Sequence, residues 1–190
     1  MMTDTHPPGV LVAQLGSRRH FAVPIALEQA GQLTRFFTDL YGRAWVRFLA
    51  DVIPSTGLRR WAGRQSDQIP GDKVKDFPWF GLQYKRLGAR ARTASDITAS
   101  WLWGGKRFCE LVCAEGLHPA RGVYAYSSAA LELLQAARAQ GLAGFLDQAT
   151  APWRHENALR EEEKARWPGW DIDSPPDEWG PRYAERQAQE

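Results

Sequence analysis

Apolar residues form a continuous run over 10–13, and this run begins a strand–turn–helix pattern. Such a run is typical of a strand buried on both faces of a parallel sheet. It stops at the polar segment 16–20, GSRRH, and apolar residues then return at helical spacing. We therefore predict a strand over 10–15 and a helix over 21–30, with Gly31 as the residue that ends the helix.

The alternation of strand-like and helix-like patterns continues along most of the chain. Further strands are predicted over 33–39, 73–77, 122–126 and 144–148, and further helices over 44–49, 58–64, 80–87, 97–113, 129–140 and 155–166. Short connections between alternating elements predict an α/β fold, with helices flanking a parallel sheet through right-handed crossovers.

Capping residues are predicted at the starts of two helices, and a glycine pair stands inside one of them. Asp96 is predicted to cap the helix over 97–113, and the Ser127-Ser128 pair is predicted to cap the helix over 129–140. Gly104 and Gly105 lie inside the longer helix, where they mark either a kink or a close approach of two backbones.

The chain divides into three parts. Residues 1–8 are expected to be a disordered leader, 9–155 a domain, and 156–190 a charged helix and tail that lead toward a domain missing from this sequence. Residues 181–190 are polar and contain no core-forming segment by pattern. If a domain is missing, we expect the carboxyl edge of the sheet to be an open, apolar face.

Composition narrows the class of protein. The chain has 190 residues, with 44% hydrophobic and 24% charged residues and a net charge of +2, as expected for one soluble domain; this charge is too small to indicate a nucleic-acid partner. No secretory signal and no run of about 20 apolar residues is present, so a cytoplasmic location is expected. Cys109 and Cys113 are predicted to be free, buried thiols rather than a disulfide or metal pair.

Two basic segments interrupt this balance. Residues 59–64 mix tryptophan with arginine, and 84–92 contain four basic residues and no acidic one. Each is either a solvated face of a helix or a surface for an anionic acceptor or a membrane interface, peripheral to the inner membrane.

The turn after the first strand is the first candidate binding site. At the carboxyl edge of a parallel sheet, the free N–H groups of the next helix favour an anion, and Arg18, Arg19 and His20 add donors there. Only Gly16 is present where a dinucleotide-binding motif has three glycines, which disfavours a nicotinamide or flavin site. Alternatively, Gly16 only turns the chain, and the arginines are solvated.

Four segments resemble the N-terminal domain of bacterial GT-B glycosyltransferases of the group 1, family four type. They are LGSRRHFAVPIALEQAGQLTRFFTDLY, WLWGGKRF, VYAYSSAALELLQAARAQGL and FLDQATAP. The resemblance implies a Rossmann-like domain that holds the acceptor of a retaining sugar transfer. It also implies a nucleotide-sugar donor, a glycan or lipid-linked acceptor, a setting in cell-surface polysaccharide synthesis, and no metal or other cofactor.

The resemblance also assigns roles to residues. Gly16, Ser17 and Arg18 would contact the donor phosphates. Arg19, Tyr126 and Gln148 would lie on the acceptor side, and His20 and Asp39 would be catalytic; for His20, a capping or packing role is the alternative.

The sequence departs from the family in lacking the C-terminal, nucleotide-sugar-binding domain and its glutamate pair. Glu156 and Glu163 lie in the charged helix and are not that pair. We therefore expect a transferase half that is incomplete or inactive alone, with a split partner chain as one explanation. A non-catalytic binding module and an unrelated phosphate-binding Rossmann-like protein are the alternatives.

Overall fold

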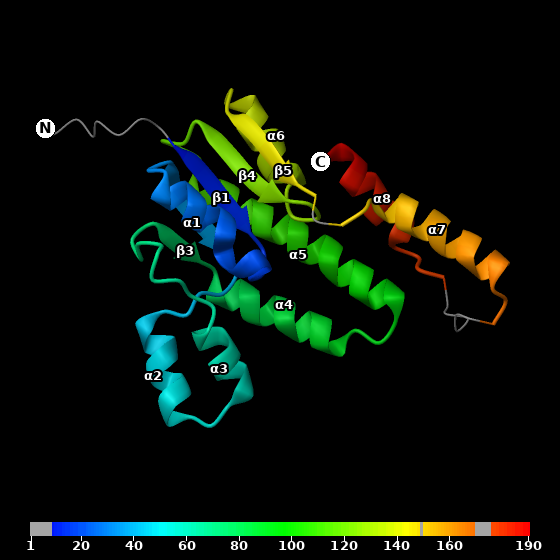
Figure 1. The fold of residues 1–190 in the computed structure, drawn as a ribbon, viewed down its shortest axis with the longest axis horizontal. Helices are drawn as coiled ribbons and strands as arrows, with labels where there is room; N and C mark the ends of the chain where they lie inside the picture. Colours follow the sequence, from blue (N-terminus) through cyan, green and yellow to red (C-terminus); the bar gives the residue numbers. More distant parts are fainter. Residues whose placement is uncertain (1–8, 149, 170–175) are drawn as a thin grey trace, which may run out of the picture.

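A computed structural model describes residues 9–148, 150–169 and 176–190 of the chain. Its centre is a sheet of five parallel strands in the order β3-β2-β1-β4-β5 (Figure 1). The strands are β1 (Val10–Gln14), β2 (Leu33–Thr38), β3 (Val74–Asp76), β4 (Gly122–Tyr126) and β5 (Ala143–Asp147). The predicted α/β class and the five predicted strands are confirmed.

Eight α-helices and one 3-10 helix are described. They are η1 (Arg18–Phe21), α1 (Ala22–Gln29), α2 (Ala44–Val52), α3 (Thr56–Ala62), α4 (Pro78–Arg90), α5 (Ala94–Glu115), α6 (Leu131–Ala139), α7 (Trp153–Arg166) and α8 (Gly180–Gln189). Gly31 follows α1 with φ +67°, as predicted for the residue that ends this helix. The predicted leader over 1–8 lies outside the described residues.

Helices cover both faces of the sheet, and each face has its own core. Leu11 and Phe37 point to the face that α4, α5 and α6 cover, where they pack with residues such as Phe108. Val12 and Phe36 point to the opposite face, where they pack with Phe21 and α1. Every residue of β1 is buried, because the strand lies in the middle of the sheet and is covered on both sides.

The start of α5 corrects a predicted cap. Thr93, and not Asp96, is the N-cap residue: the Thr93 side chain accepts a hydrogen bond from the Asp96 N–H, and the Asp96 carboxylate accepts one from the Thr93 N–H. This reciprocal pair is a capping box, so the helix begins three residues earlier than predicted. The backbone N–H groups of Arg92 and Thr93 lower the pKa of Asp96 below its ordinary value.

The glycine pair inside α5 marks a close approach of backbones. The helix runs continuously from Ala94 to Glu115. A Cβ atom on Gly105 would overlap the carbonyl group of Ser128, and one on Gly104 would overlap the ring of Tyr84. Glycine is therefore needed where α5 passes the loop after β4 and the neighbouring helix α4. Cys109 and Cys113 are both free, as predicted, with Cys109 buried in the core.

The tail differs from its prediction. Residues 180–189 form α8, which packs on α5 and α6, and Tyr183, Ala184 and Arg186 are buried (Figure 1). Arg186 donates two hydrogen bonds to the Glu132 carboxylate of α6, both of 2.7 Å. The sequence pattern did not identify this helix as core-forming, because its apolar residues are few and its buried cation has its partner elsewhere in the chain.

Candidate functional site

A cavity of about 560 Å³ lies at the carboxyl edge of the sheet, between the loops that follow β1 and β4. In the sheet, β2 lies on one side of β1 and β4 lies on the other, so the strand order reverses its direction at β1. The cavity therefore lies at the switch point of the strand order, where open α/β sheets bind ligands. It is the best candidate for a functional site.

The loop after β1 forms one wall and is held by internal hydrogen bonds. Gly16 has φ +88°, a backbone conformation that favours glycine. The amide of Gln14 donates to the carbonyl oxygens of Gly16 at 3.0 Å and of Arg18 at 2.9 Å. The Gly16 N–H donates to the Asp39 carboxylate at 3.0 Å. This N–H, which was expected to contact a donor phosphate, is therefore bound to a carboxylate of the chain itself.

Asp39 is buried behind the loop and forms an ion pair with Arg64. Two nitrogens of the Arg64 guanidinium donate to the two carboxylate oxygens, and the Thr38 hydroxyl donates a further hydrogen bond at 3.2 Å. Asp39 does not line the cavity. Arg64 is thus turned inward, so the interpretation of 59–64 as a solvated face applies to Arg59 and Arg60 only.

Arg18 is the cation of the cavity wall. Its side chain is half-buried, and its guanidinium carbon lies 5.9 Å from the centre of the Tyr126 ring, an arrangement that allows a cation–π interaction. Ser17 lines the cavity beside it and is exposed. Of the predicted site residues, Gly16, Ser17, Arg18 and Tyr126 are brought together here.

The loop between β4 and α6 forms the opposite wall. The predicted capping role of the Ser127-Ser128 pair is wrong: the N-cap of α6 is Ala130, and no side chain of this turn caps the helix. Instead, the Glu190 carboxylate accepts hydrogen bonds from the N–H groups of Ser128, at 2.8 Å, and Ala130, at 3.2 Å. An anion therefore lies at the helix N-terminus, as expected from the orientation of its N–H groups, but the anion comes from α8.

Glu190 is fully buried in this position, with Arg186 at 3.7 Å. Burial raises the pKa of Glu190 above its ordinary value, and the two N–H groups and Arg186 act in the opposite direction.

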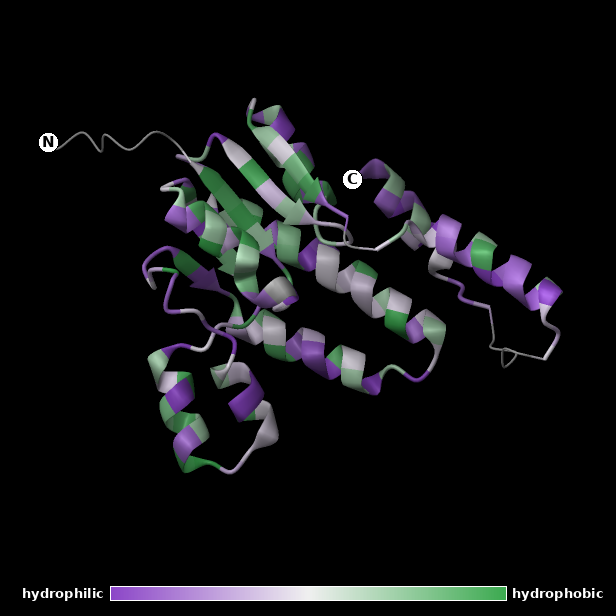
Figure 2. Ribbon diagram, in the orientation of Figure 1, coloured by the Kyte–Doolittle hydropathy of each residue, from purple (hydrophilic) through white to green (hydrophobic). Residues whose placement is uncertain are grey.

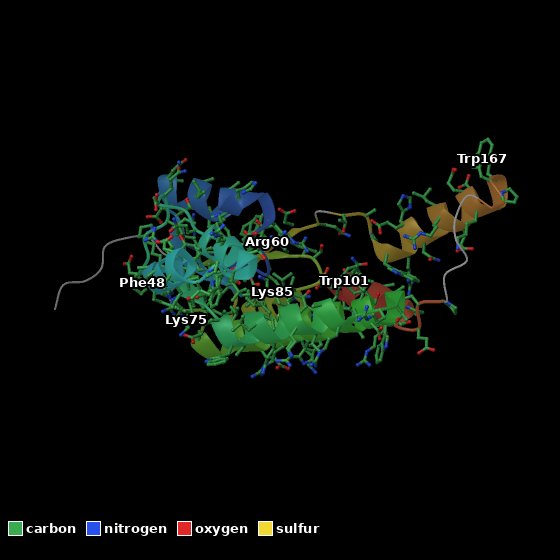
Figure 3. All side chains as sticks on the ribbon, turned by 90° about the horizontal axis from the view of Figure 1, so that it is seen from below. Phe48, Arg60, Lys75, Lys85, Trp101 and Trp167 are labelled. Atoms are coloured by element: carbon green, nitrogen blue, oxygen red, sulfur yellow. The ribbon has the colours of Figure 1, made fainter. Side chains whose placement is uncertain are left out.

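Five aromatic side chains line the cavity: Tyr84, Trp101, Tyr126, Trp153 and Tyr183. Burial raises the pKa of Tyr84 to about 12 and raises the pKa of Tyr183, so both hydroxyls are neutral near pH 7 and can donate hydrogen bonds. The Tyr183 hydroxyl lies 2.5 Å from the Ser128 hydroxyl, and the Tyr183 ring lies 5.7 Å from that of Trp101. Figure 3 shows Trp101 of α5 beside α8.

Of the predicted site residues whose side chains the structure describes, His20, Gln148 and, as noted above, Asp39 do not line this cavity. His20 is exposed in η1 with φ +49°, and Gln148 is exposed just after β5. Arg19 also belongs to η1, but its side chain is outside the part of the chain that the structure describes. The short helix η1 turns the chain at residue 18, so residues next to one another in the sequence point in different directions.

Four cavity residues come from α7 and α8, which the sequence patterns did not connect with the site. They are Trp153 and Glu156 of α7 and Tyr183 and Gln187 of α8. The spacing of four residues within α8 was the only signal, since it places Tyr183 and Gln187 on one face of a helix. The carboxyl edge is therefore not the open apolar face that was expected, because α7 and α8 cover part of it.

Within the described residues, no three His, Cys, Asp or Glu side chains form a group that could hold a metal ion. None of the described helices combines the length and the apolar composition that a membrane-spanning helix needs.

Comparisons with known proteins give no relative: no family model matches the chain, and no curated protein or solved structure shows significant similarity to it. The fold itself defines the class. The chain is an α/β protein with a Rossmann-like, all-parallel five-stranded sheet flanked by helices.

Proposed function

We propose that this chain is the acceptor-side half of a glycosyltransferase that uses a nucleotide-sugar donor, and that the cavity between β1 and β4 holds the saccharide. The aromatic lining of this cavity carries the proposal. A cavity lined by aromatic rings and a few polar groups is suited to a ligand with both apolar and hydroxyl surfaces. Sugars have this character, because their C–H faces pack on rings while their hydroxyls form hydrogen bonds.

The polar groups of the cavity complement a sugar. The neutral hydroxyls of Tyr84 and Tyr183 can donate, and the carboxylate of Glu156 and the amide of Gln187 can accept. With the sugar in the cavity, Arg18 is the side chain best suited to a phosphate of the donor, because it is the cation of the wall and its charge is permanent. Ser17 lies beside it on the same loop.

The occupied N–H groups limit what the loops contribute to donor binding. Gly16 donates to Asp39, and the N-terminus of α6 is bound to Glu190. Most donor contacts therefore come from a second domain or chain in this proposal, as the resemblance to the N-terminal half of these enzymes implies. The proposal requires no metal or cofactor.

The decisive experiment is a screen for sugar-nucleotide hydrolysis and transfer. The chain is assayed alone and mixed with a nucleotide-sugar-binding protein encoded by an adjacent reading frame. We expect activity in the mixture only, reduced at least tenfold by Arg18→Ala, which removes the charge at the phosphate. The control is Arg138→Ala, an exposed position on α6 outside the cavity. Equal loss in both variants, or no activity in the mixture, contradicts the proposal.

A non-catalytic saccharide-binding module is the second candidate function. The observation that favours it is that Asp39, one of the residues assigned to catalysis, is buried and ion-paired with Arg64. Such a module would bind saccharides, observed as a change in tryptophan fluorescence because Trp101 and Trp153 line the cavity, without turnover in any mixture.

Asp39→Asn distinguishes a structural from a catalytic role of this residue. Because the substitution leaves Arg64 partly buried without its charged partner, we expect the free energy of unfolding to fall by about 3 kcal/mol. Glu110→Gln is the matched control: it removes an exposed ion pair with Arg107 and should cost less than about 0.5 kcal/mol. A variant that unfolds like the parent protein but is inactive in the mixture would instead make Asp39 catalytic.

A further inference from the structure

Helix α2 exposes an apolar stripe that the core does not use. Its residues Val46 and Ala50 face inward, but Trp45, Phe48 and Val52 follow one another at three- and four-residue spacing on the outer side. Phe48 is 67% exposed and Val52 is 64% exposed. Ile53, at the end of the helix, is 44% exposed. Single exposed apolar residues are common on proteins, but a continuous stripe of four indicates an interaction surface.

The stripe lies on a hairpin of two helices, α2 and α3, that projects from the body of the domain (Figure 1). Figure 2 shows hydrophobic residues along α2 and at the far end of this hairpin. A protruding apolar tip fits a deformable partner that can surround it, whereas a protein partner of fixed shape would need a matching groove.

The hairpin is anchored by buried residues, and of the stripe Trp45 packs edge-on against Trp61, with the ring centres 5.3 Å apart. The indole N–H of Trp61 donates to the Tyr41 carbonyl oxygen at 2.9 Å, and the Gly42 N–H donates to the Arg64 carbonyl oxygen at 2.8 Å. Leu40, Val46 and Trp61 form its small core. Phe48, Val52 and Ile53 are therefore exposed on a fixed support, while Trp45 also packs within the hairpin.

Exposed basic side chains lie on the same hairpin as the stripe. Arg47 of α2 and Arg59 and Arg60 of α3 are exposed, and none of them has an acidic partner among the described residues. Asp51 is the single acidic residue over 44–62. In Figure 3, which is seen from the side of the hairpin, Phe48 and Arg60 lie on opposite sides of the hairpin. The charge complements an anionic surface.

We propose that the α2–α3 hairpin binds to the interface of a membrane that contains anionic lipids. Phe48, Val52 and Ile53 enter the boundary between headgroups and acyl chains, and Trp45 lies at headgroup depth, where tryptophan is favoured. The three arginines contact lipid phosphates. The sequence analysis considered 59–64 and 84–92 for such a contact, and the structure adds the apolar partner, which is α2. This inference does not depend on the chemistry of the cavity.

The test is sedimentation of the full chain with vesicles of phosphatidylcholine, with and without phosphatidylglycerol. We expect binding to the anionic vesicles only, weakened by salt because the arginine contribution is screened. Phe48→Ser with Val52→Ser should reduce the partition coefficient at least tenfold. Arg47→Gln with Arg59→Gln and Arg60→Gln should reduce it about fivefold for each arginine at low salt.

Matched control variants distinguish binding through the hairpin from nonspecific binding through other exposed apolar or basic residues. Leu159→Ser with Trp167→Ser removes exposed apolar residues of α7, whose end with Trp167 lies at the opposite end of the molecule from Phe48 (Figure 3). Arg138→Gln with Arg154→Gln and Arg160→Gln removes three other exposed arginines. Both controls should bind like the parent chain.

Four results would overturn the proposal, and the first three concern the vesicle assay. They are no binding to anionic vesicles, equal loss in the hairpin and control variants, and salt-independent binding that the arginine variant leaves unchanged. A fourth is a parent chain that is dimeric in solution and becomes monomeric in the Phe48→Ser and Val52→Ser variant, which would assign the stripe to a second copy of this chain.

Discussion

Gly16 joins the fold to the candidate site through its backbone. Its φ of +88° lets the chain turn at the end of β1, and its N–H then reaches the carboxylate of Asp39, 23 residues later. No atom lies within 4 Å of the place where a Cβ would be, so space does not exclude a side chain here. The requirement for glycine is therefore one of backbone conformation alone.

Because space does not exclude a side chain at position 16, Gly16→Ala tests the requirement for a positive φ alone. We expect the substitution to lower the free energy of unfolding by about 1–2 kcal/mol, because an alanine in the left-handed region is strained. The measurement is urea unfolding. The control is Gly88→Ala on the exposed side of α4, where the Cβ also meets no atom and where helix propensity should raise stability by about 0.5 kcal/mol. Equal effects of the two substitutions would contradict the assigned conformation of Gly16.

At the scale of elements, an ion pair with α6 is one of the contacts that hold α8 in place. The Arg186 side chain is 8% exposed, and Glu132 accepts both of its hydrogen bonds of 2.7 Å. Partial burial acts to raise the pKa of Glu132, but the hydrogen bonds and the charge of Arg186 outweigh it, and the pKa is lowered below its ordinary value of 4.5. A helix with few apolar residues is thus held in place by a polar contact.

The lowered pKa predicts how the docking of α8 depends on pH. Because the folded-state pKa lies below the unfolded-state value, the stabilisation is complete above pH 4.5 and is lost as the pH falls through the folded-state pKa. The protection factors of the α8 amides, which are exchange rates corrected for the intrinsic effect of pH, should fall over this acidic window. Glu132→Gln should cost about 2 kcal/mol at neutral pH and remove this part of the pH dependence.

Glu110→Gln again serves as the control, since its exposed pair with Arg107 should leave both the stability and the pH profile of α8 unchanged. Protection of α8 that is the same in Glu132→Gln and in the parent chain would show that the ion pair does not hold the helix.

At the scale of the whole molecule, Tyr183 connects the tail with the cavity. The residue is buried, packs against Trp101, and pairs its hydroxyl with that of Ser128 on the loop after β4. The Tyr183 side chain therefore joins α8 to α5 and to the loop after β4. The shape of the cavity thus depends on the position of α8.

Tyr183→Ala is expected to lower the free energy of unfolding by about 3 kcal/mol, because it leaves a void beside Trp101. The fluorescence spectrum of the protein should shift as Trp101 gains solvent. Tyr183→Phe keeps the ring and removes only the hydroxyl, so its cost should be about 1 kcal/mol without the spectral shift. If the two variants lose the same stability, the ring does not pack as described.

Much of the fold could be predicted from the sequence, and less of the site. The five strands and their parallel class follow from local apolar patterns, because each strand carries its own pattern of burial. Gly16, Ser17, Arg18 and Tyr126 could be placed at the cavity because residues at the ends of parallel strands share one edge. His20 and Gln148 could not, because side-chain direction after a strand depends on the local turn.

Local sequence patterns were enough to predict the α/β class, the glycine turn after β1, the free thiols, of which Cys109 is buried and Cys113 half-buried, and the free donors expected at the sheet edge. Which groups satisfy those donors depends on the tertiary structure. The carboxylates of Asp39 and Glu190 do so from distant positions, and α7 and α8 complete the cavity wall. Backbone conformation and apolar periodicity depend on residues that are close in the sequence. The partner of a charge or an N–H group depends on the packing of the whole chain, which brings distant residues together.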